Sequence, residues 1–266
     1  MSNVEQLPVK ARETGPAVTL IGTDLPESYL DEAEPSPMML TASEWWLRLK
    51  RVIQVAGLVL VLGFYPALVI GSHVINDDPI ALSADRPWTS AETGTMVTLI
   101  GREIEGPGWA ADRPGWHPQA RLTGLPAWQE ALSTSMSEYA RMMAAGAPTQ
   151  RGGADPDLSA AARLMAIDPQ LPQTPRLSAA AEALARYEGR LERGLASEAG
   201  GLEGLLDKLA RMASWSDWST MELSAQIGTR DGGPASKEDI RVFYRARARA
   251  HLASQLLMAS IDAEPD

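Results

Sequence analysis

One long apolar stretch constrains this chain more than any other feature. Residues 52–75 contain no Asp, Glu, Lys or Arg over about 24 positions, the length that a helix needs to cross a bilayer core of about 30 Å. A cleaved signal peptide is the competing interpretation. Its n-region would be about 51 residues long, and its apolar core would exceed the usual 7 to 15 or so. The stretch therefore predicts one transmembrane helix.

The charges on either side of this stretch predict its direction. Arg48, Lys50 and Arg51 lie at its N-terminal edge, whereas Asp77 and Asp78 follow its other edge. Basic residues are retained on the cytoplasmic side of a membrane. We therefore expect the N-terminus in the cytoplasm and the following domain outside it.

The composition fits one anchor and one exported globular domain. The 266 residues are 45% hydrophobic and 22% charged, which is ordinary for a globular protein. The absence of cysteine excludes a disulfide framework and thiolate metal sites. The net charge of −10 argues against nonspecific binding of nucleic acid.

Shifts in composition divide the chain into four regions. Residues 1–40 are acidic and rich in proline, which predicts a disordered cytosolic tail. Residues 41–75 form the juxtamembrane and transmembrane helix, and residues 76–261 form the exported α-helical domain. Residues 262–266 are a frayed tail.

The exported region has helical periodicity almost throughout. Apolar residues recur at spacings of three and four, and Asp155 followed by Pro156 is a typical helix start. Expected helices cover residues 87–105, 126–146, 156–168, 177–199, 202–218 and 236–261. The fold class is therefore all-α, with a single transmembrane helix followed by a periplasmic helical bundle of about six helices.

Several side chains in the last three of these helices are expected to face the core because they share one face of their helix. These are Leu184, Tyr187, Leu191, Leu195, Leu202, Leu205, Leu206, Leu209, Met212, Val242, Phe243, Leu252, Leu256 and Leu257. Gly200 and Gly201 are expected to form an antiparallel turn between two helices.

A series of short motifs resembles an uncharacterised bacterial inner-membrane family, domain of unknown function 2333, over roughly residues 60 to 257. In order, the motifs are Phe64-Tyr65-Pro66, Asp77-Asp78-Pro79, Gly108-Trp109, Pro118 with Leu125-Pro126 and Gln129, Asp155-Pro156-Asp157-Leu158, Tyr187 to Leu195, and Phe243-Tyr244-Arg245. The chain departs from the family pattern at Trp116-His117, where two phenylalanines are expected, and at Thr123-Gly124, where an Asp-Asn pair is expected. The resemblance implies a single-pass protein of a Gram-negative envelope and brings no known activity.

Motifs for metal, cofactor or nucleophile chemistry are absent from the sequence. His73, His117 and His251 are dispersed without metal-ligand spacing, and there is no phosphate-binding loop and no G-x-S-x-G. Asp155 and Asp157 resemble the start of a calcium loop, but helix capping explains them better. No cofactor or metal is predicted.

The enzymatic alternative is a periplasmic cell-wall glycoside hydrolase or lyase that uses a carboxylate as acid and base. Glu103 and Glu105 beside Trp109 are the candidates, because an aromatic wall can raise the pKa of a carboxyl and stack on a sugar ring. The competing interpretation is a solvated helix end followed by a core tryptophan.

Two features favour binding of a partner. Gly63, Ala67 and Gly71 recur every four residues, which gives the anchor a small-residue face for another transmembrane helix, although Gly and Ala are common in such helices. Arg241, Arg245 and Arg249 also recur every four residues. They predict a basic stripe that binds lipid headgroups, an acidic partner or the anionic wall polymer. The alternative is a face paired with Glu238 and other acids of the domain.

Five tryptophans either line a groove for a sugar or an apolar peptide, or fill the helical core. They are Trp109, Trp116, Trp128, Trp215 and Trp218.

The sequence thus predicts an inner-membrane protein that serves as a scaffold or binding module for another envelope component. Its expected partners are the lipid bilayer, another membrane or periplasmic protein, and a further copy of the chain in a homo-oligomer. The structure can discriminate this function from the hydrolase. An enzyme needs a cleft with a buried polar group of perturbed pKa, whereas a binding module shows a flat or grooved apolar patch.

Overall fold

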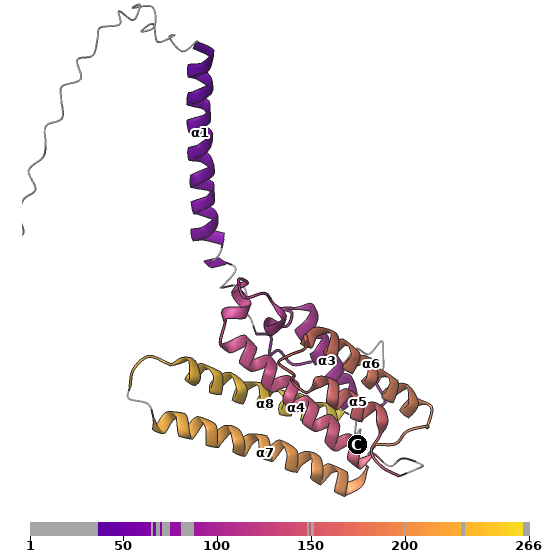
Figure 1. The fold of residues 1–266 in the computed structure, drawn as a ribbon. Coiled ribbons are helices and arrows are strands. Elements are labelled where there is room, and N and C mark those ends of the chain that lie inside the picture. Colours follow the sequence, from indigo (N-terminus) through magenta and orange to yellow (C-terminus); the bar gives the residue numbers. More distant parts are fainter. Residues whose placement is uncertain are drawn as a thin grey trace, which may run out of the picture. The chain divides into compact units, whose positions relative to one another are not determined.

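All regular elements in the described part of the chain are helices, which confirms the predicted all-α class (Figure 1). This computed structural model describes residues 37–64, 66–67, 70, 75–80, 88–147, 149, 152–198, 200–229 and 232–262. Of the predicted tails at 1–40 and 262–266, residues 1–36 and 263–266 lie outside the described residues, whereas residues 37–40 and 262 belong to helices, contrary to the prediction. The chain divides into two compact units, Met1–Gly57 and Leu58–Asp266.

The N-terminal helix α1 covers Pro37–Val59 and is followed by a π-helix at Leu60–Phe64. It begins four residues before the predicted start, because proline is well accommodated in the first helical turn. The predicted span at 52–75 falls partly outside the described residues, at 65, 68–69 and 71–74. Within the described residues, no helix combines the length and the apolar character needed to cross a bilayer.

Six helices form the bundle of the second unit. They are α3 Ala91–Glu105, α4 Gly124–Gly146, α5 Pro156–Met165, α6 Gln173–Glu192, α7 Gly201–Gly228 and α8 Lys237–Asp262, with 3₁₀ turns at Ala110–Asp112 and Pro118–Arg121. Helix α4 is central and packs against α5, α7 and α8, while α3 packs against α6 and α8. Helix α7 packs mainly on α8, so the predicted turn at Gly200 and Gly201 does not join an antiparallel pair.

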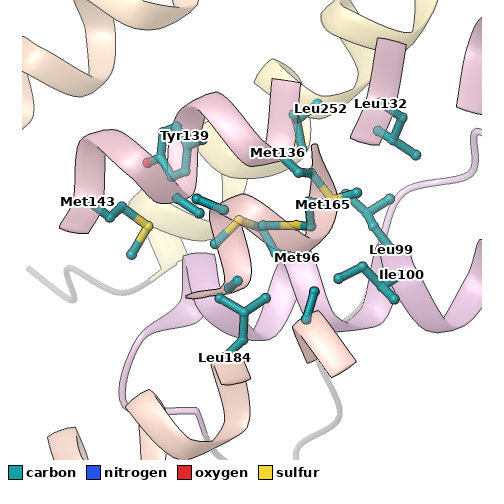
Figure 2. Close-up of a cluster of buried hydrophobic side chains, with 14 of the residues drawn as sticks. Met96, Leu99, Ile100, Leu132, Met136, Tyr139, Met143, Met165, Leu184 and Leu252 are labelled. Atoms are coloured by element: carbon teal, nitrogen blue, oxygen red, sulfur yellow. The ribbon is translucent and has the colours of Figure 1, made fainter. Parts of the chain in front are cut away.

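The core lies where α3, α4, α5, α6 and α8 converge (Figure 2). Its labelled side chains are Met96, Leu99, Ile100, Leu132, Met136, Tyr139, Met143, Met165, Leu184 and Leu252, all at most 5% exposed. Each helix contributes residues three or four positions apart, so one stripe of each helix is buried, as the periodicity predicts.

The predicted start of α5 is confirmed in atomic detail. Asp155 is the N-cap, and its Oδ1 accepts hydrogen bonds from the backbone N–H groups of Asp157 at 3.0 Å and Leu158 at 3.1 Å. The Arg190 guanidinium of α6 also bonds both oxygens of Asp155 at 2.8 Å. One carboxylate therefore starts α5 and joins it to α6.

Other helix ends are satisfied by side chains from distant parts of the chain. Glu188 of α6 accepts hydrogen bonds from the N–H groups of Thr89 and Ser90 at the start of α3. Asp112 accepts from the N–H groups of Gln173 at 2.8 Å and Thr174 at 2.7 Å at the start of α6. These acceptors satisfy N–H groups at the helix starts that have no partner within their own helix.

The observed C-terminal ends of α6 and α7 differ from the predicted ones. Helix α7 extends to Gly228, beyond the predicted end at residue 218. Helix α6 ends at Glu192, not 199, because Gly194 adopts a φ of 68° and the N–H of Leu195 bonds the carbonyl of Arg190 at 2.8 Å. Such a left-handed glycine with a six-to-one hydrogen bond terminates helices. Leu195 therefore lies beyond the helix and is 61% exposed, contrary to its predicted burial.

A buried ion pair holds α7 against the first turn of α3. The ammonium of Lys208 lies 2.7 Å from Oε1 of Glu92, and the Ser260 hydroxyl of α8 donates to the same oxygen at 2.8 Å. The Glu92 side chain is 6% exposed and that of Lys208 18%. Three helices therefore meet at one carboxylate.

Breaking this pair should strongly destabilise the bundle. Lys208→Met leaves the Glu92 carboxylate buried without a cation, which should lower the free energy of unfolding by about 3 kcal/mol. Adding Glu92→Gln should recover most of this loss, because no charge then remains buried. Urea titration of the detergent-solubilised chain, followed by circular dichroism, measures both values. Lys237→Met at an exposed lysine is the control, and equal small losses in all variants would contradict the ion pair's role.

Candidate functional site

The first half of α7 presents a row of leucines to the outside of the bundle. These are Leu202, Leu205, Leu206 and Leu209, with exposed fractions of 72%, 47%, 55% and 42%. The residues that α7 does bury, Gly204, Met212 and Trp215, lie on the adjacent side of the helix, turned toward the bundle. The prediction that the leucine row faces the core is therefore wrong. Among the described residues, no element covers this row.

The outer side of α8 carries a matching row. Phe243 is 53% exposed, and Leu257 and Ile261 are 38% and 72% exposed. The predicted burial of Phe243 and Leu257 is thus wrong, whereas that of Leu252 and Leu256 is confirmed at 0% exposure. Phe243 and Leu257 are separated by two heptads, so they share one face of α8.

A groove of about 640 Å³ runs between these two rows. Its lining is Met212, Trp215, Ser216, Ser219, Thr220 and Leu223 of α7 with Phe243, Ala246, Arg247, Arg249, Ala250 and Ala253 of α8. By helical spacing, Leu205 and Leu209 continue the α7 side of the groove and Leu257 continues the α8 side. We call the groove with these flanking leucines, Leu202, Leu206, Met258 and Ile261 the α7–α8 face.

The two cations of this groove are already paired within the chain. The Arg249 guanidinium lies 2.9 Å from Oε2 of Glu222, and Nε of Arg247 lies 3.0 Å from Oδ2 of Asp77. The guanidinium of Arg247 holds the pKa of Asp77 below its usual value. The face therefore offers apolar surface and little free charge, which suits an apolar helix and not an ionic ligand.

A larger hollow of about 1080 Å³ lies between α4 and α7 and has a different character. Its charged lining residues are Glu138, Arg141, Glu198, Glu203, Asp207 and Arg211. Glu138 accepts a hydrogen bond from the indole of Trp215 at 2.8 Å and lies 3.9 Å from Arg211. The mixture of signs gives this hollow no clear selectivity for a ligand.

Glu103, a candidate acid of the hydrolase alternative, is a structural residue. It is 4% exposed, and its two oxygens accept hydrogen bonds from Nε1 of Trp128 at 3.0 Å and Nε2 of Gln129 at 2.9 Å. Burial raises the pKa of Glu103, and these two hydrogen bonds partly oppose that rise. A carboxyl that is enclosed in this way cannot reach a polysaccharide, so its perturbed pKa does not indicate catalysis.

The network around Glu103 fixes the loop that follows α3. Besides bonding Glu103, Gln129 donates to the carbonyl of Gly108 at 2.9 Å and accepts from the N–H of Ala110 at 2.9 Å. Trp109 is 5% exposed inside this loop, whereas Glu105 is exposed. Glu103 and Glu105 therefore do not share a cleft with Trp109.

The tryptophans divide between the two predicted roles. Trp109, Trp128 and Trp215 are at most 5% exposed and pack in the core. Trp116 and Trp218 are 72% and 58% exposed and lie on different elements. The five side chains do not line one groove.

The predicted arginine stripe is paired with acids of the same chain. Arg241 lies 3.2 Å from Glu238, and Arg245 lies 4.0 Å from the same side chain. Since Arg249 pairs with Glu222, the structure favours the salt-bridged interpretation, and a role of the stripe in binding stays a prediction.

The small-residue face predicted in the anchor is described only in part. At Gly63, an added Cβ would meet no atom within 4 Å, and Ala67 is exposed. Gly71 lies outside the described residues, as does His73. The other two histidines lie apart. His117 caps the 3₁₀ turn at Pro118–Arg121, and His251 lies 5.4 Å from the Trp128 ring.

Metal-binding geometry is also missing from the described ranges, where no three His, Asp or Glu side chains are grouped to hold an ion.

Comparison with known proteins finds no matching family model, no matching curated protein and no matching solved structure. The resemblance of the sequence motifs to the uncharacterised envelope family therefore stays a prediction.

The raised pKa of Glu103 should make stability depend on acidity. Because the folded protein binds this proton more tightly than the unfolded chain, the free energy of unfolding should fall as pH rises from about 4.5 through the folded-state pKa. Glu103→Gln should flatten this slope. Thermal unfolding between about pH 4 and pH 8 measures it. The exposed Glu105→Gln should leave the slope unchanged, and equal slopes in both variants would contradict the assignment.

Proposed function

We propose that this protein is a membrane-anchored binding module of the bacterial inner membrane, with its N-terminus in the cytoplasm and its helical bundle in the periplasm. The bundle acts as a scaffold that binds another membrane or periplasmic protein. An apolar helix of that partner docks on the α7–α8 face. The observation that carries the proposal is this grooved apolar face, which a binding module requires and a hydrolytic cleft does not.

The anchor is supported by the apolar stretch at 52–75 and its basic N-terminal edge. Side chains along the described part of this stretch are strongly exposed, including Val52 at 63%, Leu58 at 57% and Leu62 at 66%. Surface of this kind is unfavourable in water and favourable in lipid. The bilayer is therefore the first proposed partner.

The hydrolase receives no comparable support. Of its two candidate carboxyls, Glu103 is enclosed by Trp128 and Gln129, and Glu105 is solvated. The geometry therefore favours binding over catalysis.

Cysteine labelling tests the proposed orientation without background, because the chain contains no cysteine. In intact cells with a permeable outer membrane, a membrane-impermeant maleimide should label Ser178→Cys on the outer surface of α6. It should label Ser28→Cys in the N-terminal tail only after the inner membrane is lysed. Equal labelling of both variants before lysis, or labelling of position 28 alone, would refute this topology.

Position-specific photo-crosslinking tests the binding face. A photoreactive residue at Leu202 should form a covalent protein adduct in intact membranes, because this side chain is exposed at the proposed face. The same residue at Leu195, which is 61% exposed on the loop after α6, is the control and should form none. Adducts at neither position, or equally at both, would count against a docking site on α7 and α8.

A further inference from the structure

We infer that the partner seated on the α7–α8 face is the same face of a second copy of this chain, so that two α7–α8 hairpins form a four-helix bundle. This inference rests on the proposed function and names its partner. The two helices supply half of such a bundle, with one side packed on α4 and the other side apolar and uncovered.

The size of the face fits a stable dimer. Helix α7 has 28 residues, which gives a length of about 42 Å at a rise of roughly 1.5 Å per residue. Two helices packed about 9 Å apart present a face about 20 Å wide. The product is about 800 Å² for each copy, the amount that each partner buries in a standard interface.

The pattern of side chains fits a helical partner of the same kind. On α7, Leu202, Leu209, Ser216 and Leu223 are spaced by seven, as are Phe243, Ala250 and Leu257 on α8. Spacing by sevens is the repeat that lets helices pack side chains into one another along their whole length. Small residues in the groove, including Ser216, Ala246 and Ala250, allow close approach of the facing helices.

The charges of the face do not repel a second copy. Arg247 and Arg249 border the groove, and Asp77 and Glu222 neutralise them within each chain. An acidic or basic partner would need free charges of the opposite sign on this face. A neutral apolar surface is instead self-complementary, as an interface with two-fold symmetry requires.

The residues that follow the apolar stretch give a criterion for choosing the orientation of the pair. Asn76 and Asp78 bond Arg102 in the last turn of α3, whereas Lys208 bonds Glu92 in its first turn. The leucines of α7 therefore lie at the opposite end of the bundle from residues 76–78. We choose the orientation that keeps residues 76–78 of both copies at the same end of the pair, so that both chains can leave toward one membrane.

A two-fold axis that runs along the hairpin meets this requirement. It lays α7 of each copy against α8 of the other. The leucine row at the start of α7 then faces Leu257, Met258 and Ile261 of the second copy, and Phe243 faces the region of Leu223. Exposed apolar side chains of one copy therefore contact exposed apolar side chains of the other at both ends of the hairpin.

Disulfide trapping tests this arrangement directly. Two differently tagged full-length chains, one with Leu209→Cys and one with Leu257→Cys, should form a mixed disulfide in membranes under mild oxidation. Each variant expressed alone should form little, because the axis separates identical positions. No disulfide in any combination, or disulfides only between identical positions, would overturn the inference.

A charge on the face should separate the copies. In mild detergent, sedimentation should give the wild-type protein about twice its chain mass of 28.6 kDa. Leu206→Asp should lower this to a single chain, whereas Leu171→Asp should not, since Leu171 is 54% exposed away from the face and Leu206 is 55% exposed on it. A wild-type monomer, or an unchanged dimer in Leu206→Asp, would refute the dimer.

The two proposals fail in distinguishable ways. Photo-adducts at Leu202 to a different protein, without a mixed disulfide, would retain the binding module and eliminate the second copy as its partner. Absence of both the adduct and the disulfide would eliminate both proposals.

Discussion

The ion pair between Glu92 and Lys208 is the interaction on which the outer half of the bundle depends. Helix α7 buries few side chains of its own, chiefly Met212 and Trp215, so apolar packing fixes its position weakly. The buried carboxylate of Glu92 binds Lys208 of α7 and Ser260 of α8. These two contacts fix how far α7 and α8 are shifted along α3. Burial of Tyr139, together with the nearby Glu92 charge, raises the pKa of this tyrosine above its usual value and keeps its hydroxyl neutral. This contact, together with the packing of α8 on α4, fixes the position of the α7–α8 face.

Sequence patterns predicted those features of the fold that depend on local chemistry. Asp155 and Pro156 marked the start of α5, and the core residues of α3 and α4 followed from their spacing. The remaining helix ends depend on side chains that are distant in sequence, such as Glu188 at the start of α3 and Asp112 at the start of α6. No local pattern connects those partners. Gly194 was a local signal, since a glycine in the left-handed region ends α6, and a prediction that weighed it would have placed that boundary correctly.

The candidate site was predictable as a pattern but not as a surface. The leucines from Leu202 to Leu209 were recognised as one apolar stripe, yet periodicity cannot say whether such a stripe is covered by the same chain or by another. The sequence signal was the width of the apolar surface of α7, because Met212 and Trp215 lie beside the leucine row and widen it. A helix with so wide an apolar surface needs neighbours on more than one side, and in the described residues the leucine row has none.

A second copy would also change what stabilises the hairpin. Burying the exposed half of one leucine side chain contributes about 1 kcal/mol. The four leucines at the start of α7 therefore add several kcal/mol in all when a second copy covers them. Folding of the hairpin and association of two chains would then be coupled by mass action. Tethering both copies to one membrane raises their effective concentration and so favours the dimer further.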